Sequence, residues 1–199
     1  MASRWTAALI LLVMGATACG ADLAPGKFLV ASRELGDPNF VESVVLLISY
    51  EEKKGAMGLI VNRRTEVPLS RVFEDLKSAK GRSDQIYLGG PVELTTVMAL
   101  VKTTAKPADA QSVFGDVYLI ASKTSLEKAL ADRTDPAAFH VFVGYAGWGP
   151  GQLEREVDLG AWNIMNAEAP LVFHPDPESV WPRLIRRTES QIARLRLVP

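Results

Sequence analysis

The sequence has little of the chemistry that most metal and nucleophilic sites need. It contains one cysteine, Cys19, and two histidines, His140 and His174. One thiol cannot form an internal disulfide, and one cysteine with two separated histidines does not make a zinc site of the common kinds. No Gly-x-Ser-x-Gly motif occurs, and His140 lies inside an apolar stretch, which is more typical of a core or edge histidine than of a catalytic one. We therefore expect no metal ion and no bound cofactor.

An excess of charge of either sign is also missing. The 199 residues include 22 Lys and Arg against 23 Asp and Glu, and the formal net charge is −1. Without residues 1–18, in which Arg4 is the one charged residue, 21 basic residues face 23 acidic ones. Such a balance provides no electrostatic footprint for nucleic acid. The composition is otherwise that of an ordinary globular protein, and the length suits one domain better than two.

The apolar run at the N-terminus is too short to span a bilayer, which takes about 20 residues. Arg4 precedes the apolar residues 7–14, and small residues follow, which is the layout of a secretory signal. Ala16 and Ala18 fit the small-x-small cleavage rule. We expect residues 1–18 to be a signal peptide, 19–25 a tether and 26–199 a single domain.

Cys19 follows the expected cleavage point directly and indicates a bacterial lipoprotein, in which this cysteine would be acylated. The match is imperfect, because Ala16 stands where a large aliphatic residue is usual. The alternative is a soluble protein that is secreted or periplasmic. Both interpretations place the protein outside the cytoplasm.

The hydrophobic pattern predicts more strands than helices. The runs at 41–49 and 56–62 are joined by a short polar turn and predict an antiparallel pair. Residues 68–76 predict a helix, 171–173 a short strand, and 176–195 a helical region interrupted at Pro182. Many connections are too short for parallel crossovers. We therefore expect an α+β fold, in which helices surround an antiparallel-rich sheet.

The most constrained stretch is residues 144–154, Gly-Tyr-Ala-Gly-Trp-Gly-Pro-Gly-Gln-Leu-Glu, which has four glycines in its first eight residues. It predicts a strand, a sharp turn and a helix whose N-terminus could meet a carboxylate, phosphate or carbonyl oxygen. It is not a phosphate-binding loop, because no Gly-Lys-Ser/Thr follows. A plain turn with Trp148 in the core is the simpler interpretation. Because one turn rarely needs four glycines, we expect a functional surface and one wall of a cleft.

Three further segments are expected to line the same cleft. They are the turn around Asp37, the strand end at Asn62 and the turn at Gly89 and Gly90, and each also has a simple explanation as a turn or a strand end. The full set of expected binding residues is Asp37, Phe40, Asn62, Gly89, Gly90, Pro91, Gly144, Gly147, Trp148, Gly149, Gly151, Gln152 and Glu154.

Taken together, these pieces resemble the YqgE/AlgH family of bacterial proteins. The matching pieces run in the family's order, at residues 26–31, 37–40 with 43–45, 55–62, 88–92, and 144–154 with 161–162. The resemblance implies an α+β fold with a bifurcated sheet that includes a small closed β-barrel. It implies no catalytic residue. Members are described as transcriptional regulators, but the chain has neither a helix-turn-helix pattern nor a basic patch.

The chain departs from the family's pattern in two places. After the segment at 88–92, family members often continue with Arg-Gly-Phe and end in a histidine, whereas this chain has Thr-Thr-Val-Met-Ala-Leu-Val at 95–101. The resemblance therefore implies no chemistry for this chain that would use that arginine or histidine. Family members are also typically cytoplasmic, whereas this chain carries an export signal.

The sequence favours a non-catalytic module that binds a small molecule or a protein partner, exported and tethered to the membrane through Cys19. An alternative is an enzyme with a shallow cleft that uses Glu154 or Asp37 as acid or base, but the scarcity of His and Cys weighs against it. A transcriptional regulator is disfavoured by the charge balance and by export. The ligand and the oligomeric state are left open.

Overall fold

The computed structural model describes residues 22–82, 84–132 and 134–196, and the structural statements below concern these residues. The strands are β1 (Lys27–Ala31), β2 (Val44–Glu51), β3 (Gly55–Ile60), β4 (Arg64–Pro68), β5 (Gln85–Leu88), β6 (Val92–Lys102), β7 (Gln111–Phe114), β8 (Val117–Ile120), β9 (Phe139–Trp148) and β10 (Trp162–Asn166). The helices are α1 (Leu69–Val72), α2 (Lys123–Ala131), α3 (Gln152–Asp158), α4 (Ala169–Val172) and α5 (Val180–Arg196), with short 3-10 turns η1 (Lys77–Ala79), η2 (Pro136–Ala138) and η3 (Pro177–Ser179).

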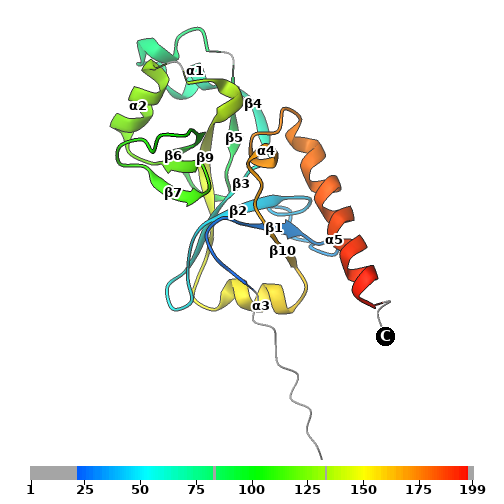
Figure 1. The fold of residues 1–199 in the computed structure, drawn as a ribbon. Coiled ribbons are helices and arrows are strands. Elements are labelled where there is room, and N and C mark those ends of the chain that lie inside the picture. Colours follow the sequence, from blue (N-terminus) through cyan, green and yellow to red (C-terminus); the bar gives the residue numbers. More distant parts are fainter. Residues whose placement is uncertain (1–21, 83, 133, 197–199) are drawn as a thin grey trace, which may run out of the picture.

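The sheet is curled and mostly antiparallel, and it forks at β9 (Figure 1). The end of β9 pairs with β3, while its first part pairs with β6 on one side and, in parallel, with β5 on the other. The strand order runs β10-β1-β2-β3-β9-β6-β8-β7, and β4 joins through β5. The predicted α+β class and the fork of the sheet are confirmed. Within the described residues, β10 and β7 stand at the two ends of this strand order and do not pair with each other. The small closed barrel implied by the resemblance is therefore not seen.

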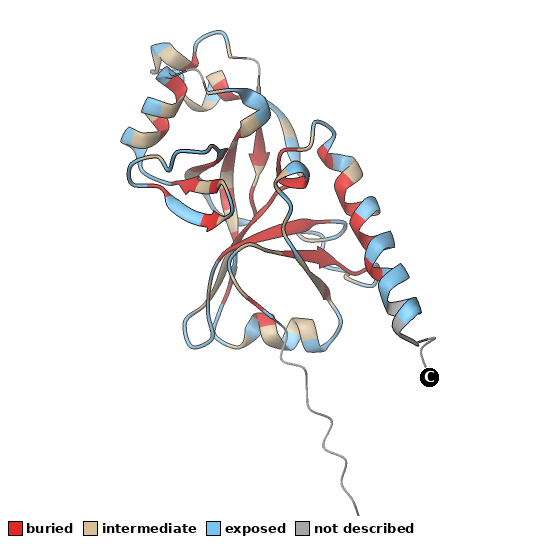
Figure 2. Ribbon diagram, in the orientation of Figure 1, coloured by how far each residue is buried: buried red, intermediate tan, exposed pale blue. Residues whose placement is uncertain are grey.

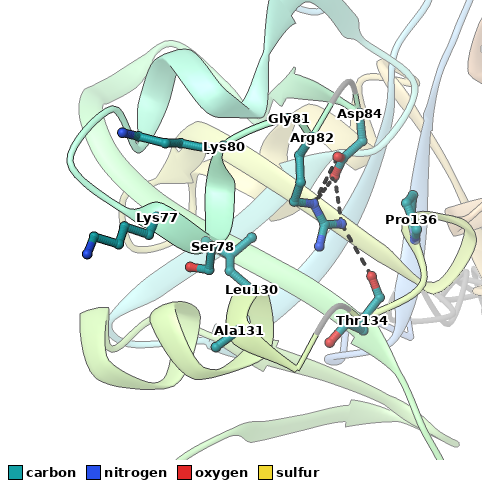
Figure 3. Close-up of a pocket in the computed structure, with 10 residues that line it drawn as sticks. All are labelled: Lys77, Ser78, Lys80, Gly81, Arg82, Asp84, Leu130, Ala131, Thr134 and Pro136. Carbon is teal, nitrogen blue, oxygen red and sulfur yellow. Dashed lines mark hydrogen bonds and ion pairs between the residues drawn. The ribbon is translucent and has the colours of Figure 1, made fainter.

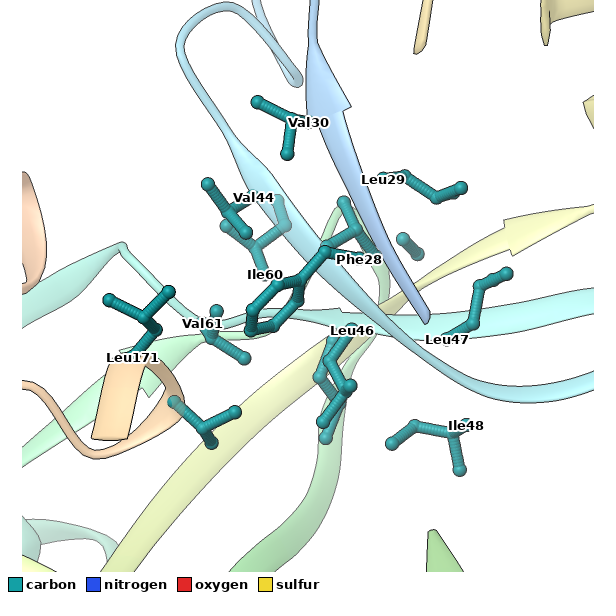
Figure 4. Packing of buried hydrophobic residues seen from close by; sticks show 14 of the residues in the cluster. Phe28, Leu29, Val30, Val44, Leu46, Leu47, Ile48, Ile60, Val61 and Leu171 are labelled. Carbon is teal, nitrogen blue, oxygen red and sulfur yellow. The ribbon is translucent and has the colours of Figure 1, made fainter. Parts of the chain in front are cut away.

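Two hydrophobic cores lie on the two sides of this fork. The larger is built around β1, β2 and β3, where Phe28, Leu46 and Ile60 are fully buried (Figure 4). The smaller lies under α1 and α2 and includes Phe139. Alternate side chains of a strand point to opposite faces, and β9 accordingly sends Phe142 into the larger core and Phe139 into the smaller one. Figure 2 shows the buried residues concentrated along these central strands.

The last helix, α5, is continuous, and the predicted interruption at Pro182 is wrong. Pro182 falls in the first turn, where its missing N–H would have had no helical partner. The buried side of the helix holds Val180, Trp181, Leu184 and Ile185, and the indole of Trp181 donates a 2.8 Å hydrogen bond to the carbonyl of Ala31. In the part of the chain that the structure describes, no helix is both long enough and apolar enough to span a membrane.

Three local expectations need correction. The helix predicted at 68–76 ends at Val72, because Phe73 leaves helical geometry at its C-cap. The strand predicted at 171–173 is helix α4, whose first turn holds a proline. Leu23, within the segment expected to be a tether, is buried in the larger core. The folded unit therefore includes residues 22–25, and the predicted signal peptide at 1–18 and Cys19 lie outside the described residues.

Candidate functional site

Residues 144–154 form the strand, turn and helix that the sequence predicts: β9 ends at Trp148 and α3 begins at Gln152. Gly151 is the N-cap and has a left-handed backbone, with φ of 69°. The side-chain oxygen of Gln152 accepts a 3.1 Å hydrogen bond from the backbone N–H of Gly149, which closes the turn. With seven residues, α3 is too short to have much of a helix dipole at its N-terminus. We call this segment the 144–154 turn.

Glu156, on α3 two residues after the 144–154 turn, holds the side chains around the turn in place through its carboxylate. One of its carboxylate oxygens accepts hydrogen bonds from the indole N–H of Trp148, at 2.9 Å, and of Trp162, at 2.8 Å. The other oxygen accepts from the side-chain amide of Gln152 at 2.9 Å. Both indoles are nearly buried, and Phe40 stacks on Trp148 and meets Trp162 edge-on. Trp148 is therefore a core residue, as in the simpler interpretation of the sequence.

Sequence reasoning missed Glu156 as a functional or structural residue. The usable signal was the spacing of Gln152 and Glu156, which puts them on the same face of a helix. The partner Trp162 stands on β10, on the other side of α3, and no local pattern connects it to the carboxylate.

The Gly89-Gly90 turn packs directly against the backbone of Gly144. The N–H of Gly89 donates to the carbonyl of Val143 at 2.9 Å, and its carbonyl accepts from the N–H of Ile60 at 2.8 Å. Gly144 has a φ of 67°, and a Cβ there would lie 2.5 Å from the carbonyl oxygen of Gly90. The fold therefore requires glycine where these two motifs cross.

The polar atoms of Asp37 and Asn62 are used within their own loops. A carboxylate oxygen of Asp37 accepts from the N–H of Asn39 at 2.8 Å, as in an Asx turn. The amide of Asn62, which is buried, accepts from the N–H of Val44 at 2.7 Å and donates to the carbonyl of Glu42 at 2.9 Å. Of the expected cleft segments, the structure brings Phe40 to Trp148 and the glycine pair to Gly144, whereas Asn62 serves to tie down the loop before β2.

Glu154 is paired with Tyr50. The tyrosine hydroxyl donates a 2.8 Å hydrogen bond to the carboxylate. Partial burial, together with this hydrogen bond and the charge of Glu154, raises the pKa of Tyr50 to about 12. A hydroxyl held in the neutral form at physiological pH stabilises the carboxylate as an acceptor, which fits a structural role better than acid–base catalysis.

Five of the best-formed cavities in the described part of the chain are lined by other segments than the 144–154 turn. One of about 610 Å³ lies between η1 and α2 (Figure 3). Its Arg82 is held by Asp84 and by the carbonyl of Thr134, while Lys77 and Lys80 point away from this ion pair. Another, of about 440 Å³, contains both histidines. Among the described residues, no three His, Cys, Asp or Glu side chains are grouped as a metal site would need.

Two glycines of the 144–154 turn are not required by the fold. Gly147 and Gly149 are exposed, and neither has a φ in the left-handed region. A Cβ on Gly147 would meet the ring of Tyr145 at 3.4 Å, an ordinary contact, and the nearest atom to one on Gly149 would be 3.9 Å away. These two positions leave bare backbone on the surface of the turn, beside the exposed side chain of Gln152.

The curled, forked antiparallel sheet and the glycine-rich crossing of two turns define a small class of α+β proteins. Residues 28–193 match the model of the AlgH-like family, and the chain belongs to that family, as its motifs predict. A UPF0301 protein from Streptomyces avermitilis is 34% identical over 183 residues, which cover 87% of this chain and 91% of the relative.

Several solved structures share the fold, among them the following two. The AlgH protein from Pseudomonas aeruginosa superposes with a TM-score of 0.69 at 30% identity and covers 88% of this chain and 94% of its own. A protein from Corynebacterium diphtheriae superposes with a TM-score of 0.70 at 24% identity, covering 83% of this chain and 87% of its own, and supports the fold alone.

Proposed function

We propose that this protein is a non-catalytic binding module and that a partner protein docks on the exposed side of the 144–154 turn. The observation that carries the proposal is the pair of exposed glycines, Gly147 and Gly149, which the fold does not require. Without a Cβ, such positions let another chain approach the backbone closely. Gly147, Gly149 and the neighbouring Gln152 are all exposed, and an exposed surface of this kind suits a protein partner better than a small molecule.

The interior of the turn supports a rigid docking platform. Glu156 fixes Trp148 and Trp162 with short hydrogen bonds, and Gln152 fixes the backbone at Gly149. A surface that is already ordered loses little conformational entropy on binding. Such a module is suited to regulating its partner by occupancy, without turnover.

The rival enzyme has less support. Its two carboxylates, Glu154 and Asp37, accept hydrogen bonds from Tyr50 and from the backbone of Asn39. Neither is among the lining residues of the five cavities described above. A substrate that reached them would have to bind on an open surface and displace existing hydrogen bonds.

We further propose that the protein acts in the cell envelope, anchored by a lipid on Cys19. The support is the order of basic residue, apolar run, small residues and cysteine at the N-terminus. The first described residue, Asp22, is exposed and lies three positions after Cys19. An anchor at that cysteine would hold the folded domain close to the membrane surface.

The docking surface can be tested by placing a photo-crosslinking amino acid at Gly149 in the full chain. The matched control carries the same amino acid at Gly36, an exposed glycine with an unrestricted φ and no atom within 4 Å of its Cβ position. We expect a discrete adduct of one partner from position 149 that position 36 does not give. Identical adduct patterns from the two positions would contradict the proposal.

A further inference from the structure

A second candidate site lies away from the 144–154 turn, in the cavity of about 440 Å³ that holds His140 and His174. We call it the histidine cavity. It opens where β4, β5 and β9 meet the segment after α4, and its volume lies in the range of small-molecule sites. Its lining residues come from distant parts of the chain, so no sequence motif announces it.

The floor of the histidine cavity is aromatic. The rings of Tyr87 and His140 are nearly parallel, at 19°, with centroids 4.4 Å apart. The ring of Phe173 lies 5.0 Å from that of His140, and Phe139 adds a further buried ring. Aromatic rings stack in an offset or edge-on arrangement at such distances. Tyr87 is 3% exposed and also packs on Phe142, with ring centroids 5.3 Å apart, so a planar ligand ring would meet this floor edge-on.

The charge at the cavity comes from Arg64. Its guanidinium is exposed, donates one 3.2 Å hydrogen bond to the carbonyl of Pro175, and has no carboxylate within 4.0 Å among the described residues. It lines the same cavity as Tyr87 and His140, so its positive charge faces the space that these two rings border. The carboxylate of the cavity, Asp84, is already held by Arg82 through two nitrogens.

The imidazole of His140 adds polarity without charge. Burial lowers its pKa to about 4 and outweighs the opposing effect of the Val172 backbone, so the ring is neutral at physiological pH. Its Nε2 lies 3.5 Å from the hydroxyl of Tyr87, and its buried Nδ1 has no hydrogen-bond partner of good geometry. The neutral ring leaves Arg64 as the cation that an anionic ligand would meet.

We propose that the histidine cavity binds a small planar aromatic carboxylate. The ring of the ligand meets the floor formed by Tyr87, His140 and Phe173 edge-on, and its carboxylate pairs with the fork of Arg64. This site shares no lining residue with the proposed docking surface and does not depend on it.

The proposal can be tested with benzoate as the probe, titrated into the purified protein and followed by NMR of the amide and aromatic signals. We expect saturable shifts centred on Tyr87 and His140, and binding of benzamide and of acetate weaker by about tenfold or more, because each lacks the charge or the ring. Absence of saturable shifts, or equal binding of acetate, would overturn the proposal.

Two arginine variants make the test specific. Arg64→Gln is expected to weaken benzoate binding by about tenfold, whereas Arg183→Gln, which alters an exposed arginine of α5, should leave it unchanged. Amide spectra of both variants check that the fold is intact. If Arg64→Gln binds benzoate as the parent protein does, the assignment is wrong. Gly147→Leu, on the docking surface, should not affect benzoate binding.

Discussion

The backbones of Gly89 and Gly144 lie in contact, so closely that a Cβ on Gly89 would collide with the carbonyl oxygen of Gly144. The two residues come from separate motifs, and the hydrogen bond from the N–H of Gly89 to the carbonyl of Val143 holds the two segments at this distance. The close approach at this crossing requires glycine at these positions, whereas the fold does not require glycine at Gly147 and Gly149. The glycines of one motif therefore divide into those that serve folding and those that remain for recognition.

The two kinds of glycine should respond differently to alanine. Gly144→Ala introduces both a strained backbone and a clash with Gly90, so it should lower the free energy of unfolding by roughly 1–3 kcal/mol. Gly147→Ala should be neutral or slightly stabilising, because its Cβ fits and the unfolded chain loses freedom. Urea denaturation of both variants measures this difference. Equal losses would refute the division.

Removing the carboxylate of Glu156 should destabilise the turn. Glu156→Ala leaves the nearly buried indole N–H groups of Trp148 and Trp162 without an acceptor, at a cost of roughly 2–4 kcal/mol. Glu154→Ala is the matched control on the same helix, since it removes the acceptor of the less buried Tyr50 only. Chemical denaturation followed by tryptophan fluorescence reports both. A smaller loss for Glu156→Ala than for the control would show that Glu156 does not hold the side chains around the turn in place.

The stability of the protein should fall on mild acidification because of His140. Burial lowers the pKa of this imidazole from its ordinary 6.5 to about 4, with Arg64 lowering it further and the Val172 backbone and Asp84 opposing. Between these values the unfolded chain binds a proton that the folded chain does not. Unfolding thus becomes easier as the pH drops, by roughly 3 kcal/mol in total from this group.

The measurement is the urea midpoint from pH 7 to pH 4.5 for the parent protein, His140→Gln and His174→Gln. His140→Gln should flatten the pH dependence relative to the parent protein, and His174→Gln, which alters a histidine bonded to the backbone of Asp176, shows the effect of removing the other histidine. Carboxylates contribute equally to all three and cancel in the comparison. A parent-like slope for His140→Gln would show that another group governs the effect.

Cys19 should determine where the protein resides. Cys19→Ser removes the site of acylation and is expected to move the protein from the membrane fraction to the soluble envelope fraction. Fractionation with immunoblotting measures the change, and a shift in mass from metabolic labelling with a fatty acid reports the lipid itself. Unchanged membrane association without label would end the lipoprotein hypothesis.

Local turn and strand chemistry was enough to predict the fold class and the strand–turn–helix at 144–154, whereas the family was identified by the resemblance of the motifs. The effect of Pro182 was harder to predict. A proline in the middle of a helix interrupts it, but α5 begins at Val180, so Pro182 lies in the first turn, where proline is tolerated. The segment at 171–173 is too short for a period to separate strand from helix, and it proved to be part of α4.

The sites were harder to predict than the fold. Four glycines within eight residues indicate an unusual backbone conformation, but they do not show at which positions the fold requires glycine. That depends on how closely Gly89 and Gly90 approach from another segment. The histidine cavity combines Arg64, Tyr87, His140 and Phe173, which no sequence spacing relates. Its parts meet only because β9 pairs with β5 in parallel and α4 returns beside them.

The central claim is that the exposed glycines of the 144–154 turn form a docking surface. The most direct test is the affinity of the crosslinked partner for the parent protein, Gly147→Leu and Gly36→Leu, measured with the melting temperature of each. We predict that Gly147→Leu weakens binding by roughly tenfold or more with an unchanged melting temperature, while Gly36→Leu binds as the parent does. Equal affinity of all three proteins would contradict the claim.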